Sequence, residues 1–301
     1  MKKTVSTILR LLAAPLVVLV LASTPLMFMP ARGIPTFSPG LALDAIGSWF
    51  DGLATGESFN YTLGQTSWRL LDTAPRFLAV SFLYVAIPGA LGLALGMALG
   101  LRARGREGGM AAHALDTLYA IPDFILALLL QLAVLVCLDL TGFKLGRISY
   151  DATGGTAMLL PFIMMSFYPF AYSFRVSARK AKDAAAADFT TYARAKGLSE
   201  RAIRLRHVGA AVVPSMEAEL PSLLALMQTN LFMAEYLFSL PGITRLLFTA
   251  AFPGRNLQMT RGYQYPLAVA VLLGILAVYG ASWLFFRGAL GLVRRGLTGE
   301  R

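Results

Sequence analysis

Five acidic side chains in or near long apolar runs are the residues of this chain best placed to do chemistry. They are Asp116, Asp123, Glu217, Glu219 and Glu235. An acid inside a membrane span is a functional candidate by default, because hydrocarbon cannot solvate its charge. Several of these acids fall near the ends of the apolar runs, where contact with water costs little. The acids alone therefore indicate neither a proton relay nor a catalytic cluster.

The common signatures of enzymes are missing from the sequence. The chain has no Gly-Lys pair, so it lacks a phosphate-binding loop of the G-x-x-x-x-G-K-[ST] type. The motifs HExxH, GxSxG and CxxC are missing as well. Two histidines and the single Cys137 are too few and too scattered for a structural zinc site. We therefore expect a protein that is not an enzyme and that binds no metal or cofactor itself.

The composition indicates an integral membrane protein. Of 301 residues, 56% are hydrophobic and only 14% are charged, against roughly 25% charged in ordinary soluble domains. A soluble protein of this composition would expose large apolar patches. The net charge of +11 suggests a nucleic-acid partner at first. The basic residues, however, lie in the gaps between apolar runs, which is typical of loops on the cytoplasmic side, so no nucleic acid is expected.

Six apolar runs approach the length of about 20 residues that crosses a bilayer. They cover residues 11–30, 77–101, 117–138, 156–174, 211–233 and 264–286. Because lipid offers no hydrogen bonds to the backbone, each run should be a helix. The predicted fold is all-α, a polytopic membrane bundle of six transmembrane helices.

The connections between the runs predict the orientation. Every second connection, together with both chain ends, contains many more basic residues than the connections between them. Both termini are therefore expected in the cytoplasm. The expected organisation is a first transmembrane helix (1–30), an external segment (31–76), a five-helix core (77–290) with a cytoplasmic loop (176–213), and a cytoplasmic tail (291–301). A cleaved signal peptide is the alternative for the first run.

Two further features have open interpretations. The long external segment 31–76 is rich in Gly, Pro, Ser and Thr, which is typical of a functional or flexible loop, either a docking surface or a lid. In the second run, Gly92, Gly96 and Gly100 share one helical face, which permits close helix packing. A moving interface is the alternative. We find no internal repeat of the kind found in many secondary carriers.

The most informative segment is polar and basic, yet lies between two apolar runs. Residues Ala184 to Lys196 favour a helix, which Gly197 should end. Ser199 can cap a second helix, and Glu200 suits the positive end of its dipole. Leu198 and Ile203 have the spacing of a hydrophobic staple. The pattern predicts a helix, a sharp turn and a short amphipathic helix that returns to the membrane.

Charge alone would assign this segment to anionic lipid headgroups, at roughly 1 kcal/mol per basic residue. A capped and stapled turn is more structure than a lipid contact requires. We therefore expect the segment to receive a soluble protein partner.

Two motifs resemble one known family. DFTTYARAKGLSERAIRLRH is similar to the cytoplasmic EAA loop of ABC-transporter permease subunits, and is closest to the dipeptide/oligopeptide/nickel branch. The run EYLFSLPGITRL, from Glu235 to Leu246, resembles the segment that follows the fifth span in that branch. The resemblance covers most of the chain from the second span onward.

The resemblance implies a coupling role for the loop, on the residues that match its motif. These are Ala193, Gly197, Leu198, Ser199 and Glu200, with the adjacent Arg201 as a further candidate contact. The chain departs from the family pattern in three places. Thr191-Tyr192-Ala193 replaces Glu-Ala-Ala, Gly209-Ala210 replaces an Arg-Asn pair, and the spacing from His207 to Pro214 is one residue shorter. In the second motif, the external or pathway candidates are Glu235, Phe238, Ser239, Pro241 and Gly242; simple packing is the alternative role.

The resemblance also implies the partners. It predicts a second permease subunit, ATP-binding subunits that hold ATP and Mg, an external solute-binding protein and the surrounding membrane lipid. The expected function is the permease subunit of an ATP-driven importer in a bacterial inner membrane, carrying peptides, nickel or a similar small solute. One alternative is an ion- or proton-coupled secondary carrier that works alone, and the other is a membrane enzyme.

Overall fold

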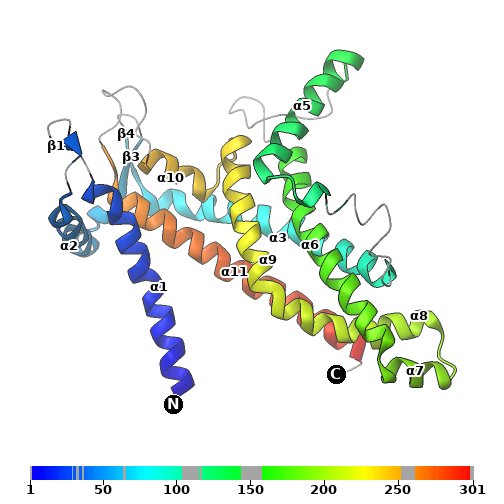
Figure 1. Cartoon of the computed structure of the whole chain (residues 1–301). Helices are drawn as coiled ribbons and strands as arrows, with labels where there is room; N and C mark the ends of the chain where they lie inside the picture. The colour runs from blue at the N-terminus through cyan, green and yellow to red at the C-terminus, as the bar shows by residue number, and fades with distance from the viewer. Residues whose placement is uncertain are drawn as a thin grey trace. The chain divides into compact units, whose positions relative to one another are not determined.

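The computed structural model describes residues 2–28, 30–31, 34–35, 37–63, 66–103, 115, 117–143, 158–251 and 262–298 (Figure 1). The chain forms two compact units. Unit 1 combines Met1–Val80 with Pro241–Val278, and unit 2 combines Ser81–Leu240 with Tyr279–Arg301. These units group distant segments of the chain, whereas the sequence division at 30, 76 and 290 follows chain order and stays a prediction.

Four helical stretches in the described residues are long and apolar enough to cross a membrane. They are α3 (Leu70–Ala103), α5 (Asp123–Thr141), the continuous run Glu200–Leu237 and α11 (Tyr265–Thr298), of which Tyr265–Leu297 qualifies. Their positions agree with four of the six expected spans.

The other two expected spans are not among these four. Run 11–30 falls in α1 (Lys2–Met27). The apolar stretch found there, Ala13–Met27, is shorter than the four candidate spans. Run 156–174 falls in α6 (Leu159–Ala186), which mixes apolar residues with tyrosines, prolines and serines and becomes basic from Arg175 onward. Six spans and the orientation of the termini therefore remain predictions.

The prediction of an all-α fold is incomplete, because the chain also contains four short β-strands in its described residues. Two short antiparallel hairpins lie within the expected external segment and at its edge: β1 (Pro30–Ala31) with β2 (Ile34–Pro35), and β3 (Asn60–Leu63) with β4 (Thr66–Arg69). Between them lie α2 (Pro39–Thr55) and a 3-10 turn, η1 (Glu57–Phe59). Two-residue strands carry no alternating pattern for sequence analysis to detect.

Side chains that precede and begin α11 tie unit 1 together. The Gln264 amide pairs with Thr62 of β3 as a neighbouring strand would, accepting from the Thr62 N–H at 2.7 Å and donating to its carbonyl at 2.8 Å. The Tyr263 hydroxyl donates to the Ala22 carbonyl of α1 at 2.5 Å. Burial, with a smaller contribution from Tyr265, raises the pKa of Tyr263 to about 12, so its hydroxyl stays protonated as a donor near neutral pH.

In unit 2, the core lies mainly between α6 and α9 (Ala210–Leu237), which run side by side (Figure 1). Methionines fill much of it: Met164, Met165, Met216 and Met227 are all at most 1% exposed. Unbranched thioether side chains fit irregular gaps, such as those next to the prolines of these helices. Pro169 lies within α6, and Pro214 and Pro221 within α9, yet both helices are continuous.

The glycines of α3 allow that helix to approach α6 closely. A Cβ at Gly92 would overlap the Ser166 carbonyl oxygen, and one at Gly96 would overlap the Phe170 carbonyl and the Ser173 hydroxyl. At Gly100 a Cβ would lie 2.7 Å from the Phe174 carbonyl oxygen. The shared glycine face is therefore a backbone-to-backbone packing surface within unit 2, as its spacing predicts.

We predict that Gly96→Ala destabilises the protein by about 1–3 kcal/mol, because the added methyl group forces α3 away from α6. Gly280→Ala in α11 is the matched control, since nothing lies within 4 Å of a Cβ there. Thermal unfolding of the purified protein in detergent measures both. Equal melting temperatures for the two variants would contradict the packing role of Gly96.

Candidate functional site

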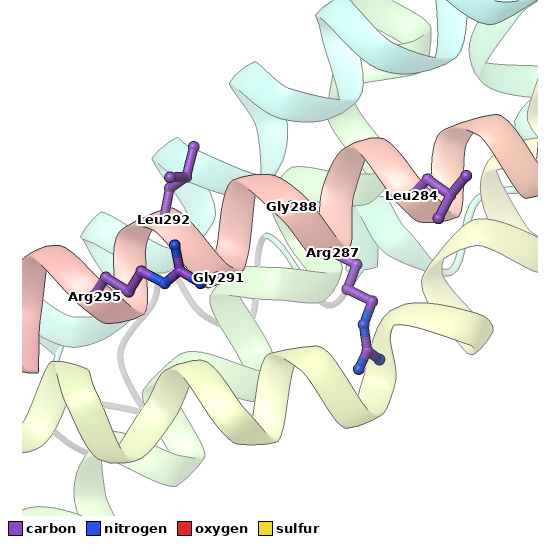
Figure 2. A pocket seen from close by; sticks show the side chains of 6 residues that line it. All are labelled: Leu284, Arg287, Gly288, Gly291, Leu292 and Arg295. Carbon is purple, nitrogen blue, oxygen red and sulfur yellow. The ribbon is translucent and has the colours of Figure 1, made fainter. Parts of the chain in front are cut away.

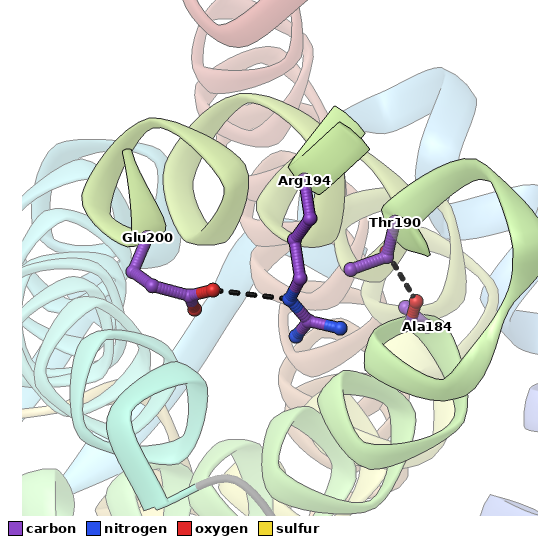
Figure 3. A network of polar contacts seen from close by, with 4 residues as sticks. All are labelled: Ala184, Thr190, Arg194 and Glu200. Atoms are coloured by element: carbon purple, nitrogen blue, oxygen red, sulfur yellow. Dashed lines mark hydrogen bonds and ion pairs between the residues drawn. The ribbon is translucent and has the colours of Figure 1, made fainter. Parts of the chain in front are cut away.

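The predicted cytoplasmic loop forms a compact elbow, residues 188–209, at the ends of α6 and α9. Its first element is α7 (Asp188–Ala195). The sequence predicts one helix from Ala184 to Lys196, and this is wrong: α6 ends at Ala186, and Ala187 is extended, with φ −75° and ψ 154°. The Thr190 hydroxyl donates to the Ala184 carbonyl at 2.7 Å and is fully buried, which pins α7 back onto α6 (Figure 3).

Gly197 ends α7, as predicted, in a left-handed conformation with φ +74°. The Gly197 N–H donates to the Arg194 carbonyl at 2.9 Å, and the Leu198 N–H to the Ala193 carbonyl at 3.3 Å. This pair of bonds is a Schellman motif, which satisfies helix-end carbonyls and reverses the chain in very few residues. The reversal needs a positive φ, which costs a residue with a Cβ roughly 1–2 kcal/mol.

The second half of the elbow begins at the predicted cap. The Ser199 hydroxyl accepts from the Ala202 N–H at 3.3 Å, at the start of α8 (Glu200–Ala202). A π-helical segment, η2 (Ile203–Gly209), then runs directly into α9. The short amphipathic helix that the sequence predicts is therefore mostly π-helix. Ile203 is buried while Leu198 remains 42% exposed, so only one of the two residues of the predicted hydrophobic staple is buried.

One ion pair joins the two halves of the elbow across its open side. The Arg194 Nε donates to Glu200 Oε1 at 3.0 Å, and these side chains are 43% and 54% exposed (Figure 3). An exposed pair of this kind contributes at most about 1 kcal/mol, because water and salt screen it. The turn at Gly197, rather than this pair, therefore sets the shape of the elbow.

The outer surface of the elbow combines apolar and basic side chains. Phe189, Tyr192 and Leu198 are 43%, 62% and 42% exposed. The Lys196 ammonium lies 4.6 Å from the Tyr192 ring centroid, and Arg201 is exposed on α8. Exposed aromatic residues beside basic ones are typical of surfaces that bind another protein.

The last residue of the elbow lies against two other helices of unit 2. A Cβ at Gly209 would meet Leu297 of α11 at 3.4 Å and Leu101 of α3 at 3.9 Å. A second link lies nearby in the chain, where Arg294 of α11 pairs with Glu217 of α9 at 3.4 Å. A displacement of the elbow would therefore act on α3, α9 and α11 together.

The structure divides the predicted loop residues into two groups. Ala193, Gly197 and Ser199 shape the elbow, since Ala193 is 3% exposed and the other two form the turn and the cap. Leu198, Glu200 and Arg201 lie on its exposed surface. Sequence reasoning missed Phe189, Tyr192 and the buried Thr190. Two aromatic residues at a spacing of three in a polar segment are the signal that would have indicated Phe189 and Tyr192.

The second motif lies at the end of α9 and uses the same turn as the elbow. The Ser239 N–H donates to the Tyr236 carbonyl at 3.3 Å and the Leu240 N–H to the Glu235 carbonyl at 3.0 Å. Here the left-handed residue is Ser239, with φ +54°, in place of a glycine. Beyond the turn, Pro241 is partly exposed, Gly242 is buried, and α10 (Ile243–Ala251) follows.

Polar contacts hold the described acids that the sequence singles out, and among these contacts that of Glu235 is buried. Glu235 is fully buried and accepts from the Ser81 hydroxyl of α3 at 2.5 Å, and Phe238 is buried beside it in the chain. Glu219 accepts from the Tyr172 hydroxyl of α6 at 2.6 Å. Asp123 accepts from the Phe124 N–H at 2.9 Å, and Asp116 lies outside the described residues. These acids connect helices or helix ends within unit 2.

Comparison with known proteins identifies the family. Residues 90–288 match the model of the family described as "Binding-protein-dependent transport system inner membrane component". The chain belongs to this family. It is also 24% identical over 223 residues to the dipeptide transport system permease protein DppB of Lactococcus lactis subsp. cremoris (strain MG1363). The aligned region covers 73% of this chain and 71% of that protein.

The protein is thus a membrane-embedded permease component of an ABC importer, as the two motifs predict. Members of this family are permeases and not ATPases, and the family description makes transport dependent on a binding protein. The matched region includes the whole elbow and the turn at Ser239.

We predict that Thr190→Val in this permease loosens the joint between α6 and α7. Valine keeps the shape of threonine but removes the hydroxyl donor to the Ala184 carbonyl. The cost is roughly 0.5–1.5 kcal/mol, because that carbonyl still accepts from the Ala187 N–H. Thr191→Val is the matched control, because Thr191 is exposed. Limited proteolysis of the elbow in the purified complex, followed over time, should show faster cleavage only for Thr190→Val.

Proposed function

We propose that this permease forms part of a pathway for short peptides, and that ATP-binding subunits drive it by docking on the elbow, residues 188–209. ATP and Mg are held by those subunits. An external solute-binding protein delivers the peptide, and a second permease subunit completes the pathway in a bacterial inner membrane.

One observation carries the docking proposal: the elbow exposes a mixed aromatic and basic surface on a rigid turn. Phe189, Tyr192 and Leu198 supply apolar contact area, and Lys196 and Arg201 supply charge. A lipid-facing loop gains little from a Schellman turn and a capped helix, whereas a protein cleft needs a surface of defined shape.

The contacts of the elbow suggest how docking moves the bundle. Thr190 ties α7 to α6, and Gly209 packs against the ends of α3 and α11. ATP-driven closure of the docked subunits would shift the elbow as one body and bias these helices between two arrangements. Such a shift requires the ATP-bound subunits to bind the two arrangements with different affinities.

The assignment of peptide as cargo rests on the relative. That protein is named for dipeptide transport, and the resemblance of the second motif points to the same branch. Nickel is the other cargo that this branch suggests. At 24% identity, the choice between them needs a direct measurement.

We predict that Gly197→Leu uncouples ATP hydrolysis from uptake. The substituted residue resists positive φ, so the elbow changes shape at a cost of roughly 1–2 kcal/mol while the spans are untouched. The complex is reconstituted in vesicles with its ATP-binding subunits, second permease and binding protein. ATPase activity and uptake are measured side by side, and we expect uptake to fall at least tenfold relative to ATP hydrolysis.

Gly142→Leu is the matched control for this experiment. Gly142 ends α5 with φ +69° and, like Gly197, has nothing within 4 Å of a Cβ. It therefore has the same backbone strain at a distance from the elbow in sequence. Full coupling in Gly197→Leu, or equal loss in both variants, would refute docking on the elbow.

The cargo is tested in the same vesicles. We expect ATP-dependent uptake of a labelled dipeptide and none of nickel ions. Uptake by the permease chain alone under a proton gradient, without ATP-binding subunits, would instead support the secondary carrier. If the chain turned over a substrate, and a single acid-to-amide substitution abolished that turnover, the membrane enzyme would be supported.

A further inference from the structure

The second half of α11 has two faces of opposite character. Ser282, Phe286 and Leu290 are at most 2% exposed and pack into unit 2. On the opposite side, Leu284 and Leu292 are 66% and 69% exposed. Side chains that repeat every three to four residues mark one stripe of a helix, so the exposed residues form a continuous outer face.

This outer face contains a hollow of about 570 Å³, lined by Leu284, Arg287, Gly288, Gly291, Leu292 and Arg295 (Figure 2). The hollow exists because two of its lining residues have no side chain. A Cβ at Gly288 or Gly291 would meet nothing within 4 Å, in contrast to the tightly packed glycines of α3. Internal packing therefore does not account for these two glycines.

The charges around the hollow have a single sign. Arg287 and Arg295 both line it, and none of the described residues in its lining is acidic. The Arg287 guanidinium lies 4.9 Å from the Trp283 ring centroid, which holds it against that ring. The neighbouring Arg294 instead pairs with Glu217. Two arginines without an acidic neighbour in the described lining give the hollow a positive charge.

The hollow also lies where the sequence predicts that a span meets the membrane surface. The last apolar run of the sequence ends at residue 286, next to Arg287. Tryptophan and arginine together at such a position are typical of the headgroup level of a bilayer. Arg287 and Arg295 are eight residues apart, or roughly 12 Å along a helix, a span that a headgroup and its glycerol can occupy.

We propose that this hollow binds the phosphate headgroup of an anionic phospholipid. Guanidinium groups donate paired hydrogen bonds to phosphate oxygens. The glycines let the headgroup approach the helix backbone, and the acyl chains lie along Leu284, on the membrane side of Arg287. A helix of a second permease chain fits less well, because packing against the glycines would bury both arginines away from water, a cost that only acidic side chains of that second chain would offset.

The test uses the intact complex purified in mild detergent. Bound phosphatidylglycerol is counted by native mass spectrometry, and the melting temperature is recorded with added phosphatidylglycerol or phosphatidylcholine. Two double variants are compared: Arg287→Gln with Arg295→Gln removes the charge, and Gly288→Leu with Gly291→Leu fills the hollow. We expect both to retain roughly tenfold less phosphatidylglycerol and to lose its stabilising effect.

Arg179→Gln with Lys180→Gln is the charge-matched control, because both residues are exposed at the basic end of α6. This control should retain lipid as the unaltered complex does. Unchanged retention in both hollow variants would overturn the proposal. So would equal stabilisation by phosphatidylcholine, displacement of the lipid by inorganic phosphate alone, or a cross-link showing a second permease chain seated over Gly288.

Discussion

The elbow depends on one backbone constraint: the chain must reverse within two residues and still satisfy the carbonyls at the end of α7. The N–H groups of Gly197 and Leu198 do this by donating to Arg194 and Ala193, and the geometry requires a positive φ at Gly197. Everything outside the turn follows from it. The reversal places Ser199 where it caps α8, brings Glu200 within reach of Arg194, and leaves Tyr192 and Leu198 exposed on the outer side. Because the turn rests on backbone bonds, its shape is insensitive to the salt that weakens the surface ion pair.

The same residue type has two different consequences in this bundle. Glycines in α3 let two backbones touch, so Gly96 has neighbours at less than van der Waals distance from a hypothetical Cβ. Glycines in the second half of α11 face outward, and Gly288 and Gly291 leave a hollow lined by arginines. Spacing by three or four residues describes both sets equally well. Only the neighbours decide whether a glycine face is a packing surface or an open one.

The sequence predicted much of the elbow correctly because its signals are local. A glycine that ends a helix and a serine that caps the next one act through hydrogen bonds within a few residues, so Gly197 and Ser199 are readable without tertiary information. The break at Ala187 is different. Alanines favour continued helix, and the contact that holds α7 against α6 comes from the buried Thr190 hydroxyl, whose position depends on the folded chain. The π-helical segment, likewise, has no recognised local signal.

By itself, the sequence determined that this chain is membrane-embedded, that four of its apolar runs are long enough to span, and which family its loop resembles, because hydrophobic length and turn chemistry are properties of short segments. Tertiary structure alone decided the partners of the acids. Glu235 and Ser81 are 154 residues apart in the chain and hydrogen-bonded in the fold, and Glu219 and Tyr172 are 47 apart. It also decided that Ala193 is buried while Tyr192 is exposed. These outcomes depend on which helices pack together, and that is set by shape complementarity summed over the whole bundle.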